Sequence, residues 1–250
     1  MSSSINIDPL NRNPVTEIKE AIVLAGGLGT RLRPVVSDVP KCLAPVAGIP
    51  FLSYVISHFR NEGIMRFIFS TGYKSSMIGE YLLTSNLNYS ISKETEPLGT
   101  GGAILLATRL VSTKDVLIIN GDTLFAIDVK MIAKVHNQHS ADCTLALKQM
   151  ENFNRYGVVE QAADHSVNSF KEKQFYTTGL INGGVYALNV KNFLDENLPE
   201  KFSFERDYLE KKVNVDGERK IFSVVQDKYF IDVGIPEDYE RAQKELNINN

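Results

Sequence analysis

A glycine-rich stretch near the N-terminus constrains this chain more than any other feature. The uncharged apolar run at residues 21–25 is followed by Gly26, Gly27 and Gly29, three glycines within four residues. The apolar run predicts a buried strand, and the glycines after it leave room for another group close to the main chain. Successive backbone N–H groups in such a turn form a concave site for an anion. The stretch therefore predicts a strand that ends in a phosphate-binding loop.

Two cationic side chains accompany this loop. Thr30 and Arg31 follow the last glycine directly, and Lys41 comes after a proline further along the chain. A guanidinium binds phosphate oxygens through two parallel hydrogen bonds, and an ammonium supplies a point charge. A tight turn with solvated charges would explain the glycines alone, but not the glycines, the threonine and both cations together. We therefore expect Arg31 and Lys41 to face phosphate groups.

Two well-known phosphate loops do not fit the sequence. A Walker loop needs a Gly-Lys-Ser/Thr step, and this segment has no Gly-Lys pair. A dinucleotide fingerprint needs a third glycine where Leu32 stands. The loop therefore belongs to another class of phosphate-binding protein.

Strands and helices alternate in the first half of the chain. The apolar runs and helical periodicities predict strands at residues 64–70 and 116–119, and helices at residues 51–62, 77–83 and 101–110. This alternation is typical of a parallel sheet covered by helices on both faces. Ligands of such sheets bind beyond the carboxyl ends of the strands. We therefore expect the glycine loop and Asp122 to share one crevice.

The second half of the chain has a different pattern. It predicts short strands at residues 143–148, 157–161, 167–171 and 185–188, then a strand at 229–233 and an amphipathic helix at 236–246. Such closely spaced strands indicate a smaller mixed β region, which we expect to lie over the crevice. Residues 1–16, rich in serine and asparagine, are expected to form a flexible N-terminal extension before a single domain at residues 17–250.

The overall composition excludes several classes of partner. The formal net charge of -3 gives no basic footprint for nucleic acid. No apolar run approaches the roughly 18 residues needed to span a bilayer. The two cysteines, Cys42 and Cys143, form neither a disulfide framework nor a metal-ligand pattern. We therefore expect a cytoplasmic protein with no nucleic-acid or membrane partner.

Two aspartates stand at or within apolar strands. Asp122 follows Asn120 and Gly121 at the end of a charge-free run, and Asp232 lies inside the apolar run at residues 230–234. A carboxylate in an apolar strand needs a partner or a metal. Mg²⁺ prefers carboxylate oxygens together with substrate phosphates, although an isolated Gly-Asp step more often ends a strand in a simple turn.

The glycine loop and the segment after it resemble a known signature. Residues 24–34 read Leu-Ala-Gly-Gly-x-Gly-Thr-Arg-Leu-x-Pro, and residues 40–46 read Pro-Lys-x-Leu-x-Pro-Val. This combination is similar to the signature of the sugar-1-phosphate nucleotidyltransferases. The resemblance implies a Rossmann-like α/β fold with a mixed, mainly parallel sheet flanked by helices. It also implies a nucleotide-binding half at about residues 17–140 and a sugar-phosphate-binding half at about residues 141–250.

The same resemblance implies roles for individual residues. Arg31, Lys41, Asp122 and Asp232 would be catalytic, and the two aspartates would hold Mg²⁺. A second glycine-rich loop at residues 96–103 would hold the nucleotide base, although by itself it reads equally well as a turn that opens a helix. The residues expected to bind the nucleotide are Leu24, Ala25, Gly26, Gly27, Gly29, Thr30, Glu96, Pro97, Gly99, Thr100 and Gly121.

Three later segments resemble the sugar-phosphate segments of the family. By that match Glu172 would bind sugar hydroxyls and Lys173 the sugar phosphate. The other residues expected to line the sugar pocket are Tyr156, Gly157, Asn182 and Gly183. On its own, a Glu-Lys pair is more often solvated than part of a site.

The finer motifs indicate the substrates. Segments at residues 37–41, 49–52, 97–104, 180–186, 201–205 and 229–239 resemble the D-glycero-α-D-manno-heptose 1-phosphate guanylyltransferases. The resemblance implies GTP and a heptose 1-phosphate as substrates, and it leaves a homo-oligomer open. The Glu96 carboxylate can accept from two donors of guanine, and adenine offers it an acceptor instead. A mannose, glucose or N-acetylmuramate 1-phosphate enzyme and a catalytically silent sensor of nucleotide sugars are the alternatives.

Overall fold

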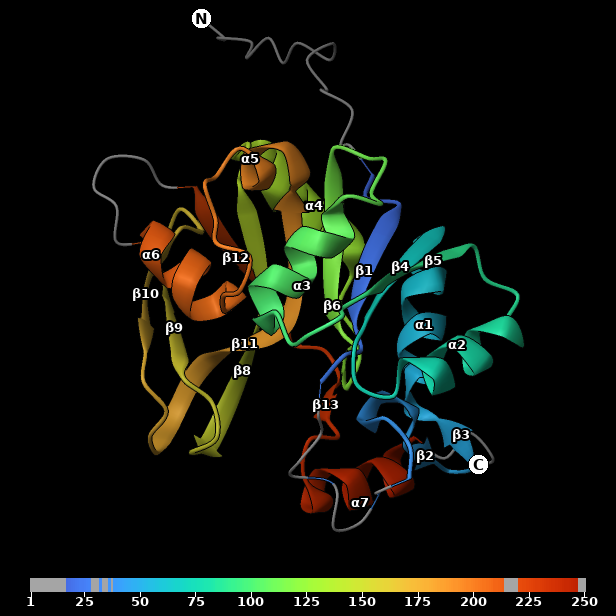
Figure 1. The fold of residues 1–250 in the computed structure, drawn as a ribbon. Helices are drawn as coiled ribbons and strands as arrows, with labels where there is room; N and C mark the ends of the chain where they lie inside the picture. Colours follow the sequence, from blue (N-terminus) through green and yellow to red (C-terminus); the bar gives the residue numbers. More distant parts are fainter. Residues whose placement is uncertain (1–16, 28–31, 33–35, 37, 214–219, 247–250) are drawn as a thin grey trace, which may run out of the picture.

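One mixed β-sheet with helices against both faces forms the centre of the protein (Figure 1). The computed structural model describes residues 17–27, 32, 36, 38–213 and 220–246, so the predicted extension at residues 1–16 lies outside it. In spatial order the strands are β10 (Val167–Lys171), β9 (Val158–Gln161), β11 (Tyr176–Asn189), β6 (Asp115–Asn120), β1 (Glu20–Leu24), β4 (Arg66–Thr71) and β5 (Tyr89–Lys93). Two further strands lie off this path: β8 (Cys143–Phe153) pairs with β11, and β12 (Ile221–Val225) pairs with β8. The mixed sheet flanked by helices confirms the predicted fold class.

The strands of the first half form a parallel part at one end of the sheet. β1 is parallel to both of its neighbours, β4 and β6, and β5 continues the parallel order beyond β4. The registers pair Leu24 with Ser70 on one side and with Asn120 on the other. Three strands therefore end side by side, as expected for the edge where the glycine loop and Asp122 meet.

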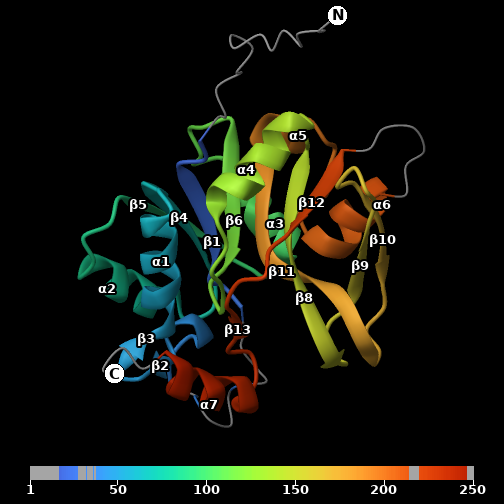
Figure 2. The ribbon, with the colours of Figure 1, turned by 180° about the vertical axis from the view of Figure 1, so that it is seen from behind.

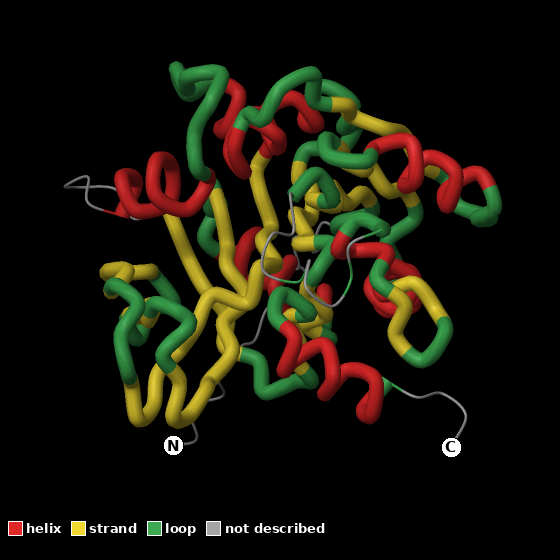
Figure 3. The backbone as a smooth tube through the Cα atoms, turned by 60° about the horizontal axis from the view of Figure 1, so that its bottom comes forward, coloured by secondary structure: helices red, strands yellow, loops and turns green. Residues whose placement is uncertain are grey.

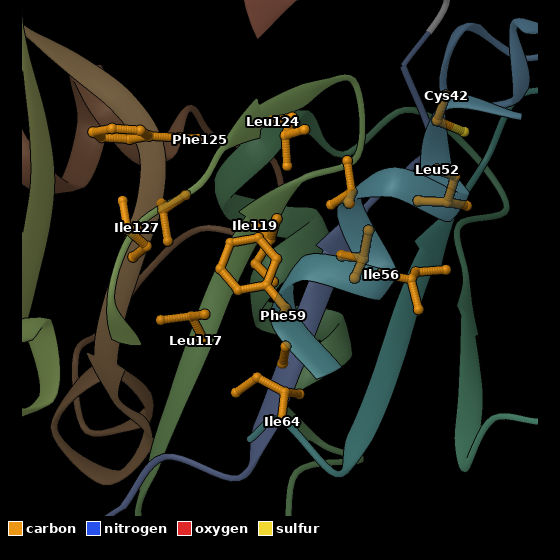
Figure 4. Close-up of a cluster of buried hydrophobic side chains, with 14 of the residues drawn as sticks. Cys42, Leu52, Ile56, Phe59, Ile64, Leu117, Ile119, Leu124, Phe125 and Ile127 are labelled. Carbon is orange, nitrogen blue, oxygen red and sulfur yellow. The ribbon is translucent and has the colours of Figure 1, made fainter. Parts of the chain in front are cut away.

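Helices cover the two faces of this parallel part. The helices of the first half are α1 (Phe51–Asn61), α2 (Ser75–Leu83), α3 (Gly99–Thr108) and α4 (Val129–Gln138). Alternate side chains of β1 enter different cores: Val23 packs in the cluster that holds Phe59 of α1, and Ile22 packs in the cluster that holds Ile104 of α3. Phe59 of α1 and Ile119 of β6 both belong to the first cluster (Figure 4). The predicted helices at residues 51–62, 77–83 and 101–110 thus form, with ends shifted by a few residues.

The strands of the second half continue the same sheet (Figure 2). β11 runs antiparallel to β6, with Val185 opposite Ile119, and it is also antiparallel to β8 and β9. β12 pairs with β8 in parallel. The pattern predicted only residues 185–188 of β11, because its first half is only partly buried and carries polar side chains that break the apolar run. The mixed β region is therefore an extension of the central sheet and not a separate layer.

A small antiparallel pair connects the chain's C-terminal part to the end of β6. β13 (Phe230–Asp232) pairs with β7 (Thr123–Phe125), so that Asp232 stands opposite Thr123. After β13 comes α7 (Pro236–Glu245), whose Gln243 donates to the Pro45 carbonyl at 2.7 Å. Pro45 belongs to the ribbon of β2 (Pro45–Val46) and β3 (Ile49–Pro50), which follows the 3₁₀ turn η1 (Lys41–Leu43). β13, α7, β2 and β3 lie beyond one end of the central strands (Figure 1), on the side that is turned toward the viewer in Figure 3.

Short helices from the second half cover the same face of the sheet as α3. These are α5 (Val190–Leu194), the π-helix η2 (Phe204–Leu209) and α6 (Glu210–Val213). Phe193, Phe204 and Tyr208 pack ring against ring with centroids 5.0 to 5.9 Å apart, and they share a core with α3. Among the described residues, no helix is both long and apolar enough to cross a membrane.

Candidate active site

Two adjoining cavities lie at the carboxyl ends of the central strands. The first has a volume of about 590 Å³ and is lined by the ends of β1, β4 and β6 and by the segment between β5 and α3. The second, of about 460 Å³, is lined mainly by β9, β10, β11 and the segment at residues 203–210. Asn120 and Glu205 line both cavities. A ligand in one cavity is therefore next to a ligand in the other.

The glycine loop forms one wall of the first cavity. A Cβ on Gly26 would lie 2.8 Å from Glu94 Oε1 and 3.0 Å from the Gly72 nitrogen. A side chain at position 26 would therefore collide with the residues that follow β4 and β5. Gly27 lines the same cavity and has open space on its Cβ side. The group that crowds Gly26 is therefore the protein itself, and the open space beside the main chain is at Gly27. Gly29, Thr30 and Arg31 lie outside the described residues.

The nine predicted nucleotide-binding residues that the structure describes fall into two groups. Seven of them line the first cavity: Leu24, Gly26, Gly27, Glu96, Pro97, Gly99 and Thr100. Ala25 and Gly121 line neither cavity. Ala25 is buried and donates to the Ser70 carbonyl, and the Gly121 nitrogen donates to the Leu24 carbonyl at 2.9 Å. These two residues hold the strand ends together instead of facing the cavity.

Lys41, Asp122 and Asp232 meet where the two cavities join. Asp122 lines the first cavity and Asp232 the second. Lys41 Nζ lies 2.6 Å from Asp122 Oδ2 and 3.5 Å from Asp232 Oδ1, and only 11% of its side chain is exposed. The pairing of β13 with β7 explains why two carboxylates so distant in sequence meet here. The carboxylates of Asp122 and Asp232 therefore lie close enough together to share one cation.

Further hydrogen bonds fix the Asp232 carboxylate. The Gly234 nitrogen donates to Oδ1 at 2.8 Å, and the Tyr156 hydroxyl donates to Oδ2 at 3.3 Å. Burial, together with the charge of Asp232, raises the pKa of Tyr156 well above its usual value, so the phenol stays protonated and remains a donor. Arg155 bridges Asp232, at 3.7 Å, to Asp238 in the first turn of α7. The sequence analysis assigned no role to Arg155 or Asp238.

The segment before α3 brings two carboxylates to the first cavity. Glu96, the residue predicted to read the base, is exposed. Glu94 is half-buried, and its Oε2 accepts from the Leu98 nitrogen at 3.0 Å. Burial raises the pKa of Glu94, and the Leu98 bond partly offsets this. The sequence shows two similar glutamates, and only the fold turns Glu94 inward.

All six residues predicted for the sugar phosphate line the second cavity. They are Tyr156, Gly157, Glu172, Lys173, Asn182 and Gly183. Asn182 is held by two hydrogen bonds, from its Nδ2 to the Tyr186 hydroxyl at 2.9 Å and from the Gly184 nitrogen to its Oδ1 at 3.0 Å. The lining residues that the prediction missed include four from in or beside the π-helix, namely Ser203, Glu205, Arg206 and Glu210, because a π-helical segment leaves no recognisable periodicity.

The strand-end cavities, the glycine loop and the converging carboxylates together define a nucleotide-binding α/β enzyme. The chain belongs to the nucleotidyl transferase family, whose profile matches residues 20–248. It is 50% identical over 231 residues to a D-glycero-alpha-D-manno-heptose 1-phosphate guanylyltransferase of Aneurinibacillus thermoaerophilus, covering 91% of this chain and 98% of that protein. It is 44% identical over 224 residues to the enzyme of the same name from Campylobacter jejuni, covering 88% and 96%.

A solved structure has the same fold. It is that of HddC from Yersinia pseudotuberculosis complexed with GMP-PN, with a TM-score of 0.80 and 35% sequence identity. The match covers 92% of this chain and all of that one. The predicted family is thereby confirmed, and this protein is a nucleotidyltransferase.

Enzymes of this family generally use a divalent metal, and the residues at the junction fit one. Asp122 and Asp232 face a common cation position, and a cationic side chain already lies there. The described residues contain no group of three or more metal-ligating side chains. A hard cation that is bound by one or two carboxylates plus substrate phosphates matches this donor set.

Proposed function

We propose that this protein transfers the guanylyl group of GTP to D-glycero-α-D-manno-heptose 1-phosphate, giving GDP-heptose and pyrophosphate. The observation that carries the proposal is the position of the Lys41, Asp122 and Asp232 cluster at the junction of two cavities. The two curated guanylyltransferases described above support the choice of substrates. In this proposal the first cavity takes the nucleotide and the second the sugar phosphate.

The chemistry requires positioning and neutralisation of charge. An oxygen of the sugar phosphate attacks the α-phosphorus of the nucleotide, the bond to the β-phosphate oxygen breaks, and pyrophosphate leaves. The attacking phosphate is already an anion at pH 7, so no general base is needed. Holding two anionic groups in line and stabilising the charge that develops between them accounts for catalysis of this type.

Each cation has a place in this arrangement. Lys41, at the junction, neutralises the α-phosphate region, and Lys173, in the second cavity, pairs with the sugar phosphate. The motif assigns Arg31 to the departing phosphates. We propose Mg²⁺ as the metal, held by Asp122 and Asp232, where it would reduce the negative charge of the phosphates that it contacts.

We further propose that Glu94 takes part in reading the guanine base. Its carboxylate is half-buried in the first cavity, beside Gly26 and Gly72 of the strand ends. An ionised carboxylate can accept from the N1 and N2 donors of guanine, whereas adenine would face it with an acceptor. Leaving a desolvated carboxylate without partners is unfavourable. Glu96 is more exposed and would contribute less.

The proposal also includes the cellular location. Cys42 and Cys143 are both buried free thiols, which is the state expected in the reducing cytoplasm. The predicted cytoplasmic location is therefore retained as part of the proposal.

Product analysis tests this function. The purified protein would be incubated with GTP, Mg²⁺ and one sugar 1-phosphate at a time: heptose, mannose, glucose or N-acetylmuramate. Mass spectrometry of the products should show GDP-heptose and stoichiometric pyrophosphate. GDP-mannose as the main product would move the protein to the mannose branch. No nucleotide sugar from any pair would favour a silent sensor.

A further inference from the structure

The segment at residues 200–204 is docked on the N-terminus of α3. The Gly101 nitrogen donates to the Phe202 carbonyl, and the Phe202 nitrogen donates to the Leu98 carbonyl, both at 3.0 Å. A Cβ on Gly101 would lie 2.2 Å from the Phe202 ring, and one on Gly102 would lie 2.3 Å from the Glu200 carbonyl oxygen. These glycines therefore make room for a segment of the chain itself, where the sequence suggested room for a nucleotide.

The docking places Glu205 between the two cavities. Glu205 lies at the start of η2 and lines both of them. Its Oε2 accepts from Thr100 Oγ1 at 2.8 Å and from Ser203 Oγ at 3.1 Å. Thr100 Oγ1 in turn accepts from the Phe204 nitrogen at 2.9 Å. The Thr100 hydroxyl is thus committed to Glu205 and the backbone, although Thr100 was predicted to contact the base.

The other oxygen of Glu205 has much weaker protein contacts. From the described part of the chain, Oε1 receives one long hydrogen bond, at 3.4 Å, from the hydroxyl of Tyr186. Tyr186 also lines the second cavity, and its hydroxyl accepts from Asn182, another lining residue. Oε1 is therefore turned toward the second cavity. A carboxylate oxygen can accept two hydrogen bonds, so Oε1 retains capacity for a ligand.

We propose that Glu205 is a specificity-determining residue for the sugar, with Thr100 as its positioning residue. This inference rests on the proposed function. Oε1 accepts a hydrogen bond from a hydroxyl of the sugar 1-phosphate, while Thr100 and Ser203 hold Oε2 and so fix the direction of the carboxylate. Hydrogen bonds to an ionised acceptor are stronger than neutral ones. A π-helical turn at this point is consistent with a functional position.

A Glu205→Gln substitution tests the assignment, because the amide is isosteric but lacks the charge. We expect the KM for the sugar 1-phosphate to rise about tenfold or more, equivalent to about 1.4 kcal/mol. The KM for GTP should change less than about twofold. Single-deoxy sugar 1-phosphates add a second readout. The analogue that lacks the contacted hydroxyl should be a poor substrate of the wild type, and the variant should discriminate against it much less.

An exposed glutamate on α2 provides the control for Glu205→Gln. Glu80→Gln, on the exposed face of α2, should leave both KM values unchanged. If Glu205→Gln raises the KM for GTP and not that for the sugar, Glu205 belongs to the nucleotide site and the proposal is wrong. Unchanged values for both substrates would also refute it.

Thr100 provides a second pair of variants in case Glu205→Gln does not fold. Thr100→Ser keeps the hydroxyl and Thr100→Val removes it at nearly constant volume. We expect Thr100→Val to raise the KM for the sugar and Thr100→Ser to retain the wild-type value, with thermal unfolding followed in parallel. A rise in the KM for GTP alone in Thr100→Val would instead identify a direct nucleotide contact.

Failure of the proposed function would be distinguishable from failure of this inference. The comparison uses whichever sugar 1-phosphate the wild type converts, so a different preferred sugar changes the proposed function but not the test. If the wild type converts none, calorimetric binding of each sugar 1-phosphate to the wild type and to Glu205→Gln replaces kinetics. Equal affinities in that measurement would refute the role of Glu205.

Discussion

The Lys41 ammonium lies 2.6 Å from Asp122 Oδ2 and thereby joins the 3₁₀ turn η1 to the end of β6. Asp232 approaches the same ammonium from β13, at 3.5 Å. The active-site charges are thus held by three separate segments that meet beyond the strand ends. Because asparagine has nearly the same shape as aspartate, either carboxylate can be changed to an amide without leaving a hole.

Substitution of either aspartate by asparagine should remove most of the activity. Asp122→Asn and Asp232→Asn are each expected to lower kcat by about 10²-fold or more, because a charge that orders the phosphates and the metal is lost. Steady-state kinetics over a range of Mg²⁺ concentrations would measure this. Asp227→Asn, an exposed partner of Lys148, should behave like the wild type. A variant with normal kcat and the same Mg²⁺ dependence would show that its aspartate is not a ligand.

The two glutamates before α3 should differ in their effect on the choice of nucleotide. Glu94→Gln is expected to lower the ratio of kcat/KM for GTP to that for ATP by about tenfold or more, because it removes a desolvated acceptor. Glu96→Gln should change the ratio less, since Glu96 is exposed. The measurement is kcat/KM for both nucleotides in all three proteins. A larger effect of Glu96→Gln would return the base contact to the residue that the sequence predicted.

The positions of the strand ends were predictable from the sequence because short apolar runs and the glycines beside them mark each end. The charge-free runs in β1 and β6 and the glycines after β1 place the predicted phosphate loop and Asp122 at strand ends without knowledge of the fold. The choice between Glu94 and Glu96 was not predictable, since the two are chemically equal and only the turn before α3 decides which one is buried. Glu205 was also missed, because its contact with Thr100 depends on the docking of two segments distant in sequence.

The glycines of α3 show a second limit of the sequence signal. A glycine-rich loop indicates close approach of some group, but it does not say which group. At Gly101 the group is the Phe202 ring of the same chain. The glycine-rich loop at Gly26 instead lines the first cavity. Only the three-dimensional structure distinguishes the loop at Gly26 from the one at Gly101.

The stability of the fold should depend on pH through Glu20. Burial alone would raise the pKa of Glu20, but hydrogen bonds from Arg66, Ser112 and Thr113 outweigh it and lower the pKa to about 2 from a usual 4.5. The stabilisation is therefore complete above about pH 4.5 and is lost as the pH falls toward 2. With a side chain only 4% exposed, the shift corresponds to about 3 kcal/mol.

Glu20→Gln tests this dependence. Urea unfolding at pH 7 should give a free energy of unfolding lower by about 3 kcal/mol than that of the wild type, and the difference should shrink below pH 4.5. Glu17→Gln, an exposed neighbour, should have little effect at either pH. A difference that stays constant from pH 7 to pH 3 would assign the loss to packing and not to the ionised carboxylate.

The cysteine beside the active site should not react in the folded protein. Burial raises the pKa of the Cys42 thiol to about 12, and the charge of Asp122 adds to the effect, so the reactive thiolate is scarce at pH 8. A thiol reagent at pH 8 should therefore label neither Cys42 nor the buried Cys143 until denaturant is added, when both should react. Rapid labelling of one thiol with loss of activity would contradict the burial of Cys42.

The most direct test of the central claim is the specificity constant for the two substrates together. Pyrophosphate release would be followed with GTP, ATP, CTP and UTP, each paired with heptose, mannose, glucose and N-acetylmuramate 1-phosphates. We predict the highest kcat/KM for GTP with D-glycero-α-D-manno-heptose 1-phosphate, by a factor of about ten or more over every other pair. An equal or higher kcat/KM with another nucleotide or another sugar 1-phosphate would contradict it.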